Sequence, residues 1–121
     1  MLFFNCGKKK PPVIIIDWTS AVEQCGGDEN FLRTLLLETH KEITKSSNDL
    51  EKYSDNFIRE YAHMVKGVSQ NLFCKDLEKS SSELELLIIR DNKDKEISKH
   101  IKKLKKSILM FEKHLKIKGI L

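Results

Sequence analysis

Proline is scarce in this sequence, and long apolar runs are absent. Pro11 and Pro12 are the only prolines, so no later residue breaks a helix by lacking a backbone donor. No apolar run approaches the ~20 residues that a membrane-spanning helix requires, and residues 13–16 are far too short. Residues 1–5 are briefly apolar, but the lysines at 8–10 follow them, the reverse of a secretory signal. We therefore expect no membrane association and a cytoplasmic protein, also nuclear if the source is eukaryotic.

Cysteine is scarce as well, and its three copies do not form a ligand set. Cys6, Cys25 and Cys74 are odd in number and contain no metal-binding pair. This usage favours a reducing compartment in which each cysteine fills a small apolar space. The histidines match no zinc-binding spacing either. We expect no metal site and no bound cofactor in this chain.

Lysine, in contrast, is in excess and unevenly distributed. The formal net charge is +4, and lysines crowd the last quarter of the chain at positions 99, 102, 103, 105, 106, 113, 116 and 118. We interpret this cluster as the solvated face of a helix. An alternative is a basic surface that steers an acidic partner. Nucleic acid is not expected as a partner, because the basic stretch has no interleaved aromatic residues and no DNA-reading motif.

The spacing of apolar residues predicts an all-helical protein. Helices are expected at 17–23, from 28 with a pattern that allows continuation to 53, at 56–72, at 75–90 and through 97–115. No apolar/polar alternation of period two persists long enough for a strand. Residues 1–12 are expected to be a tail, and residues 13–121 to form one domain. Its expected fold is an antiparallel up-and-down four-helix bundle with a short additional N-terminal helix.

The third expected helix separates its residues into two faces. At roughly 100° per residue, one side collects the expected core residues Ile58, Tyr61, Ala62, Val65, Val68, Ser69 and Leu72. His63 falls nearly opposite, and its face is shared by Arg59, Lys66, Gly67 and Gln70. The imidazole of His63 is therefore predicted to point into solvent from the middle of the helix.

Two neighbours of His63 are poor choices for helix stability. Gly67 in a helix interior costs about 1 kcal/mol relative to alanine, but a missing side chain there leaves room for a partner to reach the imidazole. Lys66 places a second cation beside His63, which suits the attachment of an anion to the ring. No Asp or Glu lies within one turn of His63 on its own face, and Glu60 is offset around the helix. An imidazole with a pKa near ~6.5 is largely neutral in the cytosol and can attack phosphorus without a separate base.

A lone exposed histidine is usually only a surface residue, and the company of His63 distinguishes it. The histidines at 40, 100 and 114 have no comparable neighbours, so we expect them to be surface or boundary residues. At this point the sequence resembles a known family. Residues 62–67 resemble the signature of histidine phosphotransfer (HPt) domains, in which Ala-His, a variable residue, an aliphatic residue and Lys-Gly surround the phosphorylated histidine.

The resemblance extends over roughly residues 14–116. Asn71 and Leu72 stand where the family commonly ends this helix, and residues 16–18 and 26–32 are similar to its entry segment and first turn. Phe73 is a departure, because the family often has glycine there. Because of this substitution, the sequence does not predict the conformation of the turn into the next helix.

The resemblance implies a phosphocarrier without an ATP site, rather than an enzyme. His63 would accept a phosphoryl group from the aspartate of a receiver domain, whose own Mg²⁺ assists transfer, and pass it to another response regulator. Lys66 would neutralise the phosphoryl oxygens, and Gln70 would donate a hydrogen bond to them. The implied partners are receiver domains of hybrid sensor kinases and response regulators, with the chain itself a monomer. The implied docking surface around the histidine consists of Arg59, Met64, Gly67 and Val68.

Two other functions stay open at this point. A helical interaction module without phosphotransfer activity would have the same bundle, but we would expect it to have lost His63 or Lys66. A basic bundle that binds nucleic acid or acidic lipid is supported only by the lysine-rich last helix, and its binding would depend steeply on salt.

Overall fold

A computed structural model describes residues 15–90 and 94–121 of the chain, with the side chains of 94 and 95 left out. The tail expected at 1–12 and most of the turn expected at 91–94 lie outside the described residues. The described residues form five α-helices and one 3₁₀ turn and contain no strand, which confirms an all-helical protein. The elements are α2 (Trp18–Gln24), α3 (Glu29–Ser47), η1 (Leu50–Lys52), α4 (Asp55–Asn71), α5 (Lys75–Ile89) and α6 (Asp94–Ile117).

Three helices begin at residues whose side chains cap a free backbone donor. Asp17 accepts from the backbone of Ser20, Asp28 from Phe31, and Ser54 from Phe57. The hydroxyl and backbone N–H of Ser20 also hold the pKa of Asp17 below its usual value. The starts of α2, α3 and α4 therefore follow directly from short polar residues in the sequence.

The end of α3 differs from the longest continuation that the sequence allowed. The α-helix ends at Ser47, and residues 50–52 form a separate 3₁₀ turn. Leu50 is nevertheless completely buried. The apolar periodicity therefore runs past the end of the helix, because the tighter turn still directs Leu50 into the core.

Three helix ends share one hydrogen-bond pattern, in which two successive backbone N–H groups reach back to orphan carbonyls of the last turn. After α2 and α6 the first residue with positive φ is a glycine, Gly26 (φ +68°) or Gly119 (φ +73°). After α4 it is Phe73 (φ +58°), whose N–H donates to the Gln70 carbonyl while Cys74 N–H donates to that of Ser69. Phe73 thus occupies a left-handed position that glycine adopts with less strain.

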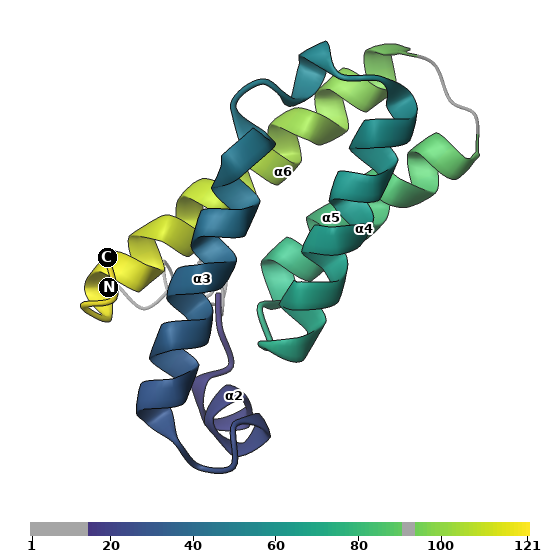
Figure 1. The fold of residues 1–121 in the computed structure, drawn as a ribbon. Helices are drawn as coiled ribbons and strands as arrows, with labels where there is room; N and C mark the ends of the chain where they lie inside the picture. The colour runs from purple at the N-terminus through teal and green to yellow at the C-terminus, as the bar shows by residue number, and fades with distance from the viewer. Residues whose placement is uncertain (1–14, 91–93) are drawn as a thin grey trace, which may run out of the picture.

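The helices pack around one continuous apolar core. Figure 1 shows α3, α4, α5 and α6 elongated in roughly the same direction, with the short α2 at one end. The helix α5 packs on both α4 and α6, and the contact of Gln70 with Glu78 and of His63 with Glu85 shows that α4 and α5 run in opposite directions. The Tyr61 hydroxyl donates to the Ile43 carbonyl and ties α4 to α3, and burial raises its pKa. No helix among the described residues is long and apolar enough to cross a membrane.

Candidate functional site

The helix α4 places its core face and its histidine as the sequence predicts. Six of the seven expected core residues are buried, namely Ile58, Tyr61, Ala62, Val65, Ser69 and Leu72. Val68 is only half-buried. The side chain of His63 is 69% exposed, so its outward orientation is confirmed. Anchoring by the opposite face leaves the imidazole open to solvent on a rigid helix.

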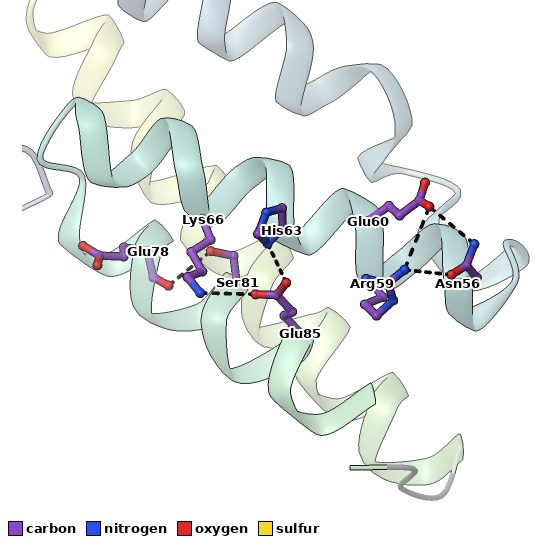
Figure 2. A network of polar contacts seen from close by, with 8 residues as sticks. All are labelled: Asn56, Arg59, Glu60, His63, Lys66, Glu78, Ser81 and Glu85. Atoms are coloured by element: carbon purple, nitrogen blue, oxygen red, sulfur yellow. Dashed lines mark hydrogen bonds and ion pairs between the residues drawn. The ribbon is translucent and has the colours of Figure 1, made fainter. Parts of the chain in front are cut away.

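A carboxylate from the next helix holds the imidazole. The Nδ1 atom of His63 lies 2.6 Å from Oε2 of Glu85, and Oε1 of the same carboxylate accepts a hydrogen bond from Lys66 Nζ at 3.3 Å. Figure 2 shows the three side chains meeting between α4 and α5. The side chain of Glu85 is only 9% exposed, whereas that of Lys66 is 32% exposed. A buried carboxylate is thus matched by two donors, which offsets part of its desolvation.

This contact fixes which ring nitrogen is available. An ionised carboxylate only accepts hydrogen bonds, so in the neutral ring Nδ1 must carry the proton. The lone pair then resides on Nε2, for which no hydrogen bond is found among the described residues. The arrangement combines an exposed nucleophilic nitrogen, a carboxylate that orients the ring, and an ammonium group one turn along the helix.

Glu85 corrects the expectation that no carboxylate stands beside the histidine. The wheel of α4 considers only neighbours on one helix, and Glu85 comes from α5. The sequence did contain a signal for Glu85, which is the only charged residue between positions 84 and 89. In the structure Glu85 is buried. A charged residue on the buried side of a helix is rare without a partner, and its partners here are His63 and Lys66.

The second expected phosphoryl-binding residue lies farther from the ring. Gln70 is two helical turns beyond His63, and its amide nitrogen donates to Glu78 Oε2 at 3.1 Å. In the described structure its side chain is therefore directed along the α4–α5 seam and not toward the imidazole.

The four expected docking residues do not share one face. Arg59 is on the side of His63, where it donates to Asn56 (Figure 2), and Gly67 is exposed with open space where a side chain would be. Met64 and Val68 are half-buried against the core. Val68 also lines a small cavity of about 180 Å³ together with Leu35 of α3. Met64 and Val68 are thus only partly exposed, and a docking surface made of these four residues stays a prediction.

Two exposed aliphatic residues on α5 were missed by the sequence reasoning. Leu86 is 45% exposed and Ile89 is 59% exposed, and Leu86 directly follows Glu85. Because α4 and α5 are antiparallel, we expect Arg59, four residues before His63, to lie near Ile89, four residues after Glu85. The apolar part of the surface beside the histidine therefore belongs to α5.

The other candidate groups have structural surroundings. His40 is paired with Glu112 across α3 and α6, and His100 bonds its own helix at the Glu96 carbonyl. Burial raises the pKa of the Cys74 thiol to about 12, so it is an unreactive core residue at neutral pH. Within the described ranges, no group of three or more His, Cys, Asp or Glu side chains could hold a metal ion.

Comparisons of this chain with protein-family models, with curated proteins and with solved structures find no match.

Proposed function

We propose that this chain is a histidine phosphotransfer protein of a phosphorelay, with His63 as the phosphoryl acceptor. The observation that carries the proposal is the exposed imidazole of His63, held through Nδ1 by the buried Glu85 with Lys66 on the same carboxylate. The sequence resemblance around residues 62–67 supports the same function independently.

The geometry supports a simple transfer step. The Nε2 lone pair of His63 attacks the phosphorus of an aspartyl phosphate, the new P–N bond forms, and the P–O bond to the donor aspartate breaks with its electron pair. The ring gains positive charge while Nδ1 keeps its proton, and Glu85 at 2.6 Å stabilises that charge. Lys66 Nζ is close enough to exchange its contact with Glu85 for one with a phosphoryl oxygen.

The proposal also includes the partners of the chain and its fold. The donors and acceptors are receiver domains of hybrid sensor kinases and response regulators, which supply Mg²⁺ and most of the transition-state stabilisation. The chain is a phosphocarrier without an ATP site, active as a monomer in the cytoplasm. Its frame is an antiparallel up-and-down four-helix bundle over residues 13–121, with Gln70 and Arg59 at the edges of the transfer surface.

The test is transfer from a panel of phosphorylated receiver domains to the full chain. We expect at least one receiver to give a label that is stable in alkali and lost in acid, as a phosphoramidate is, and that maps to the peptide containing His63. A chain that no receiver labels would instead be the interaction module without phosphotransfer activity, and an acid-stable label would contradict His63 as the acceptor, because it would lie on a hydroxyl group.

A further inference from the structure

A groove between α5 and α6 holds a second group of cationic side chains. It encloses a cavity of about 350 Å³ whose lining includes Lys79 from α5 and Lys103 and Lys106 from α6. Neither His63 nor Glu85 is among its lining residues. The groove is therefore separate from the site of the proposed phosphotransfer.

Ser107 lines this groove, and its hydroxyl has no hydrogen-bond partner among the described residues. Ser107 is only 6% exposed. Ser80 and Ser81, on the facing helix, each donate to a carbonyl of the preceding turn. Ser107 makes no such bond within the described part of the chain. The hydroxyl of Ser107 is therefore free to donate a hydrogen bond to a ligand in the groove.

The Ser107 hydroxyl is also accessible from the groove. Among the described residues, His114 Nε2 is the only fully enclosed side-chain nitrogen or oxygen atom without a hydrogen-bond partner. The unpartnered oxygen of Ser107 must therefore retain contact with open space, and the cavity that Ser107 lines is that space.

The three lysines of the groove also form no ion pair among the described residues. The ion pairs found among the described residues include Lys105 with Glu51, but none involves Lys79, Lys103 or Lys106. All three are exposed and carry long, flexible stems that let the ammonium groups turn toward one ligand. They outnumber the two carboxylates in the lining, Asp76 and Glu83, neither of which forms an ion pair with them.

We propose that this groove binds a phosphate-class oxyanion, either free phosphate or a phosphate monoester. Three ammonium groups and one hydroxyl donor suit a dianion with several acceptor oxygens better than a single carboxylate. The groove has no aromatic side chain in its lining on which a nucleobase could stack, so recognition is limited to the phosphate group.

The test is an NMR titration of the full chain with inorganic phosphate and, separately, with O-phosphoserine, each against sodium chloride at equal ionic strength. We expect saturable amide shifts around Lys79, Lys103, Lys106 and Ser107. Tighter binding of O-phosphoserine would identify a monoester as the ligand, and equal binding would identify the bare phosphate group. Shifts that do not saturate, or that match those in sodium chloride, would overturn the proposal.

Matched variants separate a built site from a diffusely basic helix. The pair K103Q and K106Q should weaken phosphate binding by about tenfold, since two charge-assisted contacts are lost. The pair K99Q and K113Q removes the same charge from the same helix outside the groove and should change binding by less than about twofold, because exposed charges are screened. Equal losses in the two pairs would contradict a site at this groove.

Two single substitutions test the remaining parts of the lining. Ser107→Ala should weaken binding severalfold and leave the helix intact, because alanine is the best helix former. Glu83→Gln should tighten binding, because it removes a negative charge from the lining. His63→Gln should leave binding unchanged, so this inference and the phosphotransfer proposal can fail separately.

Discussion

The described part of the molecule contains two histidine–glutamate pairs that join different helices at the same distance. His63 Nδ1 lies 2.6 Å from Glu85 between α4 and α5, and His40 Nε2 lies 2.6 Å from Glu112 between α3 and α6. The exposure of the partners is opposite. In the first pair the ring is 69% exposed and the carboxylate 9%, whereas in the second the ring is 14% exposed and the carboxylate 29%.

Under the proposed function, that reversal distinguishes the phosphoryl acceptor from a structural histidine. A hidden carboxylate under an open ring orients the imidazole and leaves its other nitrogen accessible. In the second pair a half-buried carboxylate and a less exposed ring join two helices, and the ring of His40 lies near Phe111, with centroids 6.5 Å apart. Lys66 adds a second difference, because it shares the carboxylate of Glu85 only. Because the two distances are equal, the difference in reactivity that we propose depends on the exposure of the ring and on Lys66.

Exchange of each histidine should give the largest contrast. His63→Gln should reduce phosphotransfer to background, since no nucleophile is left, with helicity unchanged in circular dichroism. His40→Ala should leave transfer intact and lower the free energy of unfolding by about 1–2 kcal/mol, because the half-buried Glu112 loses its donor. Urea unfolding measures the second effect. Transfer that survives His63→Gln, or that disappears with His40→Ala in a folded protein, would reverse the assignment.

Exchange of each carboxylate should give the next largest contrast. Glu85→Gln preserves the shape but removes the charge that orients the ring, so we expect transfer to slow by roughly ten- to a hundredfold. Glu112→Gln, the matched change in the other pair, should leave the transfer rate as it is. Rapid-quench measurements with one phosphorylated receiver would compare them, and equal rates in the two variants would show that Glu85 does not act on the histidine.

Removal of the shared cation should have a smaller effect. Lys66→Gln should slow transfer or shorten the lifetime of the phosphohistidine by about tenfold, the worth of one charge-assisted contact. Lys41→Gln is a suitable control, because Lys41 also contacts a glutamate at 3.3 Å, but with both side chains exposed. A phosphohistidine that decays equally in both variants would remove Lys66 from the site.

The smallest expected effect is at Gly67. Gly67→Ala should raise the free energy of unfolding by about 1 kcal/mol, since the new methyl group meets open space within a helix. The larger Gly67→Leu should raise the KM for the receiver, because a side chain then projects beside His63. If Gly67→Leu transfers like the parent chain, the space above Gly67 does not serve docking.

Much of α4 could be predicted from the sequence, because the residues that determine its start and its buried face lie within or next to the helix itself. The 3.6-residue period separates Val65 from His63, and Ser54 marks the helix start, so neither needs knowledge of a second helix. Val68 was predicted to be buried in the core and is only half-buried. The reason for this difference is also local, since Val68 lies at the margin of the core face. Positions at that margin become buried or exposed according to how closely α3 approaches.

What could not be predicted depends on tertiary packing. Glu85 reaches His63 only through the register of α4 against α5, and that register is set by the turn at residues 72–74. The turn itself contains Phe73 at a position where glycine would be the signal. The half-buried ring of Phe73 packs on the core. This contact is made with residues outside the turn, so the local sequence of the turn does not reveal it.

The most direct test of the proposed transfer step is to identify which imidazole nitrogen carries the phosphoryl group. With the imidazole nitrogens labelled with ¹⁵N, NMR of the phosphorylated full chain identifies the nitrogen coupled to phosphorus. We predict coupling to Nε2 of His63, because Nδ1 is engaged by Glu85. Phosphorus on Nδ1, or on another histidine, would contradict it.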